Sequence, residues 1–192
     1  SVRIDKGERV AVVGLNGSGK TTLVKLLCGL YDATSGAVLI NGRPIKSYDY
    51  DNYIANLTVV MQDYHVYGYS VRDNVAMTVP ADDGRVRAAI ARADLQPVVS
   101  GLPKGENTVL SMQHDEAGAV LSGGESQKLA IARALYKNGS AYIFDEPASS
   151  LDLIAEYNAY RNYDQMTSGK PCVYISHRMA TTRFCDKVVV LS

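Results

Sequence analysis

Short apolar runs recur along the chain and alternate with segments in which apolar residues have helical spacing. The apolar runs lie at 9–13, 37–40, 57–61, 141–144, 172–175 and 188–191. Those at 141–144 and 172–175 are continuous, which is typical of strands buried on both faces of a parallel sheet. The segment 21–30 has the periodicity of a helix. This alternation predicts an α/β core.

The middle of the chain has a different pattern, because helical spacing dominates from about residue 70 to 138. The pair Asp82-Asp83 can cap one helix, and a second helix is predicted over 124–136. Four residues between them are expected to break the chain: Pro97, Gly101, Pro103 and Gly105. The pattern predicts one domain over 1–192, with an α/β core at approximately 1–69 and 139–192 and an inserted helical subdomain at approximately 70–138.

The composition excludes several classes of protein. Of the 192 residues, 46% are apolar and 21% are charged, which excludes global disorder. The chain holds 20 basic and 20 acidic residues, so its charge gives no reason to expect a nucleic acid or an anionic membrane surface as the main partner. Cys28, Cys172 and Cys185 are far apart and odd in number, and we interpret them as small buried side chains in a reducing compartment. No apolar run is long enough to span a membrane, no signal peptide is visible, and Ser1 at the start suggests a fragment.

A glycine-rich loop at residues 14–21, GLNGSGKT, follows an apolar strand and opens the helical segment. This spacing and context are those of a phosphate-binding loop, in which backbone amides, a helix N-terminus and a lysine surround the phosphates. The Thr21 hydroxyl suits Mg²⁺. The candidate nucleotide-binding residues are Gly14, Asn16, Gly17, Ser18, Gly19, Lys20, Thr21 and Thr22. The alternative is a Gly/Ser turn with an incidental lysine.

Two carboxylates, Asp145 and Glu146, follow the predicted strand at 141–144. Ligands of doubly wound sheets bind at the carboxyl ends of strands, so Asp145 is a candidate for the metal shell and Glu146 for the base that activates water. The alternative is a capping pair for the helix around Leu151.

The sequence LSGGE at 121–125 is a second glycine-rich loop that enters an amphipathic helix. Its hydroxyl, flexible amides and helix dipole would form a second anion site, although alone it would be an ordinary helix start. Two phosphate-type loops in one chain suggest a nucleotide held between two subunits.

Together these motifs resemble the ATP-binding domain of ABC transporters. Walker A is 14–21, Walker B ends at Asp145-Glu146, and the signature is 121–125, while Gln62 matches the Q-loop, 149–152 the D-loop and His177 the switch histidine. The resemblance implies a P-loop NTPase (RecA-like) core with a mainly parallel sheet, an inserted α-helical signature subdomain, and ATP and Mg²⁺ as cofactors.

The resemblance also implies a role for each matched residue. Gln62 would join the Mg²⁺ shell with Thr21 and Asp145, and His177 would hold Glu146 and the attacking water. Lys20, Gln62, Glu146 and His177 are therefore the candidate catalytic residues. The residues that would contact a nucleotide from the partner subunit or couple the two sites are Ser122, Gly123, Gly124, Glu125 and Asp152.

Two features favour an exporter over an importer subunit. Glu116-Ala-Gly118 resembles an exporter element that contacts the transmembrane domain, and the segment 70–75 resembles the segment that follows an exporter Q-loop. The alternative for both is ordinary helix capping.

The tyrosines are unevenly distributed. Six of the 13 fall between Tyr48 and Tyr69, and the last three, Tyr64, Tyr67 and Tyr69, are expected to line the groove for a coupling helix or to be ordinary surface residues.

We therefore expect an ATPase that powers export through ATP-dependent head-to-tail dimerisation. The expected partners are a second ABC ATPase domain and a transmembrane domain, at the cytoplasmic face of a membrane, with no nucleic acid. The alternatives are an importer subunit, a soluble ABC ATPase of DNA repair or translation, and a non-hydrolysing switch. The 100 residues between Lys20 and Leu121 leave little room for the long insertions of DNA-repair members, and Glu146 and His177 argue against the switch.

Overall fold

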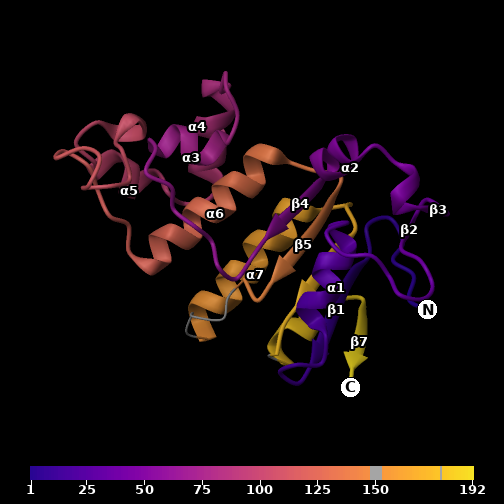
Figure 1. Ribbon diagram of the computed structural model, residues 1–192. Helices are drawn as coiled ribbons and strands as arrows, with labels where there is room; N and C mark the ends of the chain where they lie inside the picture. The colour runs from indigo at the N-terminus through magenta and orange to yellow at the C-terminus, as the bar shows by residue number, and fades with distance from the viewer. Residues whose placement is uncertain (148–152, 178) are drawn as a thin grey trace. The chain divides into compact units, whose positions relative to one another are not determined.

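The structure is a computed structural model that describes residues 1–147, 153–177 and 179–192 (Figure 1). The chain divides into two compact units, one formed by residues 1–62 and 139–192 and the other by residues 63–138. The first boundary lies earlier than the approximate position of residue 70 given above. The reason is that residues 65–70 are hydrogen-bonded to Asn74 and Arg133, which belong to the helical unit.

The first unit is built on a parallel sheet of five strands in the spatial order β4-β5-β6-β1-β7 (Figure 1). The strands are β4 (Leu57–Val60), β5 (Ala141–Asp145), β6 (Cys172–Ile175), β1 (Arg9–Gly14) and β7 (Lys187–Leu191). Every neighbouring pair is parallel. All of β6 and most of β5 are buried, as the continuous apolar runs predict.

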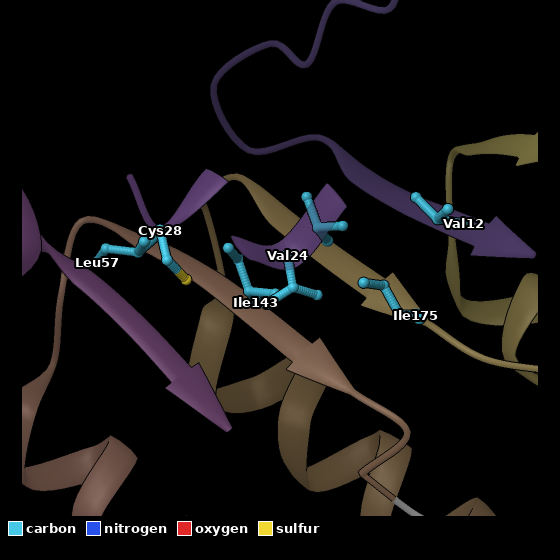
Figure 2. Close-up of a cluster of buried hydrophobic side chains, with 7 residues drawn as sticks. Val12, Val24, Cys28, Leu57, Ile143 and Ile175 are labelled. Atoms are coloured by element: carbon cyan, nitrogen blue, oxygen red, sulfur yellow. The ribbon is translucent and has the colours of Figure 1, made fainter. Parts of the chain in front are cut away.

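Helix α1 (Lys20–Leu27) covers one face of this sheet. Seven buried residues form the core there, and Figure 2 draws their side chains: Val12, Val24, Cys28, Leu57, Ile143, Val173 and Ile175. The helix ends at Leu27, earlier than the predicted 21–30. The reason is that Gly29 adopts a left-handed conformation with φ of 69°, and its amide donates a hydrogen bond to the Leu26 carbonyl.

Strand alternation sends the intervening side chains of β5 and β6 to the opposite face, toward α7 (Leu153–Thr167). The side chains there are aromatic: Tyr142 and Phe144 from β5, Tyr174 from β6, and Tyr160 and Tyr163 from α7 are each at most 2% exposed. Phe144 lies 4.6 Å from Tyr163 and 5.0 Å from Tyr174 between ring centroids. The sheet thus separates an aliphatic core from an aromatic one.

The smaller elements of this unit lie between β1 and β4 or after β6. They are the hairpin β2 (Leu39–Ile40) and β3 (Arg43–Pro44), η1 (Ile45–Ser47), α2 (Tyr50–Asn56) and η3 (Met179–Phe184). Asn41 and Gly42 form the turn that closes the hairpin, with φ of 50° and 78°.

The second unit is helical, with α3 (Val71–Ala76), α4 (Asp83–Arg92), α5 (Gln96–Gly101), η2 (Gly105–Asn107) and α6 (Gly123–Lys137). Asp82 caps α4 by accepting from the Arg85 amide, as predicted. The prediction of a broken chain from Pro97 to Gly101 is wrong, because this stretch forms α5 with Pro97 in the first turn. Proline is tolerated there since its missing amide has no partner within the helix.

Two other expectations can be compared with the structure. Cys28 and Cys172 are buried, whereas Cys185 is only partly buried, so the prediction that all three cysteines are buried is wrong for Cys185. In the part of the chain that the structure describes, no helix combines the length and the apolar character needed to cross a bilayer.

Candidate active site

The carboxyl ends of four strands bring most of the candidate residues to one edge of the sheet. In register, Val12 of β1 lies beside Ile175 of β6, which lies beside Asp145 of β5. Gly14 ends β1, His177 follows β6, and Gln62 follows β4. This edge is where ligands of parallel α/β sheets bind.

The phosphate-loop candidate holds its lysine in place. The Lys20 side chain is buried, and its ammonium donates at 2.8 Å to the carbonyl of Gly14 and at 2.8 Å to that of Leu15. Gly17 and Gly19 have φ of 84° and 93°, where other residues are strained. A Cβ on Gly14 would lie 2.5 Å from the backbone carbonyl oxygen of Leu191 and 2.5 Å from Ser18 Oγ, so only glycine fits at the end of the strand.

The two adjacent carboxylates, Asp145 and Glu146, lie in different environments. Asp145 is 8% exposed at the end of β5. Glu146 has a left-handed backbone with φ of 48°, and its amide donates to the Ile175 carbonyl at 2.9 Å. This conformation brings Glu146 Oε1 to 3.1 Å from His177 Nδ1. The carboxylate and the imidazole, which are far apart in sequence, therefore meet.

The two further candidates are Gln62 and Asp152. Gln62 is exposed just beyond β4, and its side chain has no hydrogen-bond partner among the described residues. Asp152, with the rest of the 149–152 motif, lies outside the described residues.

The 121–125 segment begins helix α6 of the helical unit. Ser122 Oγ accepts from the Glu125 amide at 3.4 Å, and Glu125 Oε2 accepts from the Ser122 amide at 2.8 Å. This capping box lowers the pKa of Glu125, chiefly through the hydrogen bond from the Ser122 backbone. Gly123 and Gly124 are exposed, and among the described residues no atom beyond their chain neighbours and the helix backbone lies within 4 Å of where a Cβ would be built on them. The N-terminus of a 15-residue helix is thus open to an incoming group.

Comparison with known proteins decides the family. The family model described as "ABC transporter" matches residues 1–149. The chain belongs to the ABC transporter family. This confirms the resemblance drawn from the motifs.

Among ABC transporter relatives, the chain is 41% identical to the mitochondrial iron-sulfur clusters transporter ATM1 of Saccharomyces cerevisiae, covering 100% of this chain and 28% of that protein. It is 38% identical to the ATP-dependent lipid A-core flippase of Paraburkholderia xenovorans, covering 100% of this chain and 31% of the relative. It is also 38% identical to the subtilin transport ATP-binding protein SpaT of Bacillus subtilis. The chain spans less than a third of the length of the two transporters ATM1 and the flippase.

A solved structure of a bacterial Atm1-family ABC exporter with ATP bound matches 98% of this chain and 32% of that chain. The TM-score is 0.87 and the sequence identity is 33%. These values confirm the predicted fold class, a P-loop α/β core with a mainly parallel sheet.

The residues at the sheet edge fit the ATP and Mg²⁺ of an ABC domain. Ser18 Oγ is buried and has no hydrogen-bond partner among the described residues, in a loop that offers amides and the Lys20 cation. Thr21 and Thr22 are exposed in the first turn of α1, and Asn16 is exposed in the loop. A hydroxyl at Thr21 and a carboxylate at Asp145 are oxygen ligands of the kind that Mg²⁺ prefers.

One residue of this ABC domain's site escaped the sequence analysis. The buried hydroxyl of Tyr163 donates at 3.2 Å to the carbonyl of Pro147, the residue after Glu146. The available signal was the helical spacing of Tyr160 and Tyr163, which places both rings on one face of α7. That spacing predicts a buried stripe but not the partner of the hydroxyl.

Proposed function

We propose that this chain binds Mg-ATP, hydrolyses it to ADP and phosphate, and thereby powers export across a membrane. The observation that carries the proposal is the pair of Glu146 and His177, 3.1 Å apart at the edge that also holds the phosphate loop. The exporter names of the relatives and the ATP in the matched exporter structure support it.

Each candidate residue has a task that its position suits. The loop amides and the Lys20 ammonium bind the phosphate oxygens and neutralise their charge. Glu146 orients a water and accepts its proton, and His177 holds the Glu146 carboxylate in the attacking direction. Thr21, Asp145 and Gln62 would hold a Mg²⁺ ion, which when bound would supply further neutralisation of the phosphate charge.

Assembly is the second part of the proposal. Ser122, Gly123, Gly124 and Glu125 present the N-terminus of α6 to the γ-phosphate bound by a partner ATPase domain, so two copies close head to tail around ATP. Asp152 couples the two sites of the dimer. The partner is either a second copy of this chain or a related domain.

The third part concerns the membrane. Tyr67 and Tyr69 are stacked with ring centroids 6.3 Å apart and are 42% and 60% exposed. Together with Tyr64 and the 116–118 element they offer aromatic and polar contacts suited to a docking helix. We place this surface against the transmembrane domain, at the cytoplasmic face of a membrane.

The names of the relatives point to no common cargo. Relatives with identities of 41%, 38% and 38% carry names that refer to iron-sulfur clusters, a lipid A-core and subtilin. This level of similarity in the ATP-binding domain does not separate cargoes.

Phosphate release from ATP by the purified chain and by Glu146→Gln tests the proposal. Removal of the base is expected to lower turnover by about 10²–10⁴-fold, the usual worth of general base catalysis, while ATP remains bound. Glu106→Gln is the matched control, because Glu106 pairs with Arg87 in the helical unit and has no assigned role. A Glu146→Gln rate near that of the parent would show that another residue activates the water.

A further inference from the structure

The aromatic core under α7 includes residues that lie shortly before both members of the Glu146–His177 pair in the sequence. They are Phe144 on β5 and Tyr174 on β6. Phe144 lies on β5 directly before Asp145, the last residue of the strand, and its ring contacts those of Tyr163 and Tyr174. Tyr160 packs edge-on against Tyr163 at 6.0 Å and against Tyr174 at 5.8 Å between centroids. A buried aromatic layer therefore lies behind the strand ends that carry the candidate catalytic groups.

Within this layer, Tyr163 is distinguished by where its hydroxyl points. The side chain is fully buried, and the hydroxyl donates to the carbonyl of Pro147 at 3.2 Å. Tyr174 is equally buried, but its hydroxyl meets the side chains of Cys172 and Thr167, at the opposite end of β6 from His177. Two buried tyrosines of one cluster thus hold different parts of the chain.

The position of the Pro147 carbonyl matters because the residue before it, Glu146, has an unfavourable backbone conformation. Glu146 has a left-handed backbone, which costs energy for a residue with a side chain and which a following proline restricts further. Its amide is fixed to the Ile175 carbonyl at 2.9 Å on one side. The Tyr163 hydroxyl fixes the peptide group on the other side, so the turn that aims the carboxylate at His177 is held at both ends.

We propose that Tyr163 is a positioning residue for ATP hydrolysis, which acts by holding the Glu146–Pro147 turn through the Pro147 carbonyl. The proposal rests on the proposed ATPase activity. Tyr163 contacts neither ATP nor water in this role. Its hydroxyl narrows the range of Glu146 orientations, and so it affects the chemical step more than the binding of ATP.

Steady-state ATP hydrolysis by Tyr163→Phe, with Tyr174→Phe as the matched control, gives the first test. Each variant keeps its ring and loses one buried hydroxyl. We expect kcat of Tyr163→Phe to fall about tenfold, the usual effect of one such hydrogen bond, with the ATP dissociation constant within about twofold of the parent. Tyr174→Phe should keep the parental kcat. A kcat within about twofold of the parent for Tyr163→Phe, or equal losses in both variants, would overturn the proposal.

The second test does not depend on catalysis. Hydrogen exchange of the Glu146 amide, measured by NMR on the 192-residue chain, reports how often the turn opens. We expect about tenfold faster exchange in Tyr163→Phe than in Tyr174→Phe. Equal exchange in the two variants would overturn the positioning role even in a chain that hydrolyses ATP. If the parent chain showed no ATPase activity while exchange was still faster in Tyr163→Phe than in Tyr174→Phe, the result would support the positioning of the turn and refute the proposed function.

Discussion

Asn74 holds the loop that follows the Q-loop candidate, and its replacement by alanine is expected to be strongly destabilising. The side chain is fully buried in α3. Its Nδ2 donates to the carbonyls of Tyr67, Tyr69 and Ser70 at 2.9, 3.1 and 3.0 Å. Its Oδ1 accepts from the Tyr67 amide at 3.0 Å and from Arg133 Nη2 at 2.6 Å.

The size of the effect follows from these contacts. A neutral hydrogen bond contributes about 1 kcal/mol net, and one to a charged group about 1.5–3 kcal/mol. The three carbonyls share two N–H groups, and effects at one side chain are not additive. Alanine gains about 0.5 kcal/mol from helix propensity. We therefore expect Asn74→Ala to lower the free energy of unfolding by about 4 kcal/mol, near the upper end for single substitutions.

Thermal unfolding followed by circular dichroism measures this loss, with an expected fall in melting temperature of about 10 °C for a chain of this size. Asn107→Ala is the control, because Asn107 is exposed and its side chain makes no hydrogen bond to the described residues. It should stay within about 0.5 kcal/mol of the parent. A loss below about 1 kcal/mol in Asn74→Ala would refute the view that this side chain organises the loop.

Three further predictions address the site and the fold. Lys20→Ala should weaken ATP binding and hydrolysis together, as measured by calorimetry and phosphate release, because the ammonium neutralises phosphate charge before and during reaction. Glu146→Gln should be monomeric without nucleotide and dimeric with ATP by light scattering, and adding Ser122→Arg should return it to monomer while ATP still binds. Hydrogen bonds from Arg9 lower the pKa of Asp186 from 3.8, so their stabilisation is present at neutral pH and is lost as the pH falls through the lowered pKa. Asp186→Asn should therefore lower the urea midpoint at pH 7 and leave it unchanged well below pH 3.8.

Much of the fold follows from local patterns in the sequence. The continuous apolar runs predict β5 and β6 because buried parallel strands need apolar residues on both faces. The apolar pattern does not predict where α1 ends, nor that residues 96–101 form helix α5. A left-handed Gly29 and a first-turn Pro97 depend on backbone conformations that the apolar pattern does not encode.

The candidate site likewise contains residues that the sequence locates and a contact that it does not predict. Motif spacing locates Lys20, Glu146 and His177, because each follows a strand or lies in a loop with a fixed relation to one. The hydrogen bond from Tyr163 to Pro147 joins residues whose approach is set by the packing of α7 on β5. No spacing rule in the sequence predicts it, so such a contact becomes visible only in the folded chain.

The pairing of β1 has a consequence for how the protein is made. Within residues 1–192 this strand is synthesised early, yet both of its neighbours, β6 and β7, lie between residues 172 and 191. Contacts of such long sequence separation form late, whereas the helices of residues 63–138 pair locally and can fold while translation continues. A nascent chain that ends before residue 172 carries the whole phosphate-loop motif but has no strand on either side of β1. The sheet around the phosphate loop can therefore form only after residues 172–191 have been synthesised.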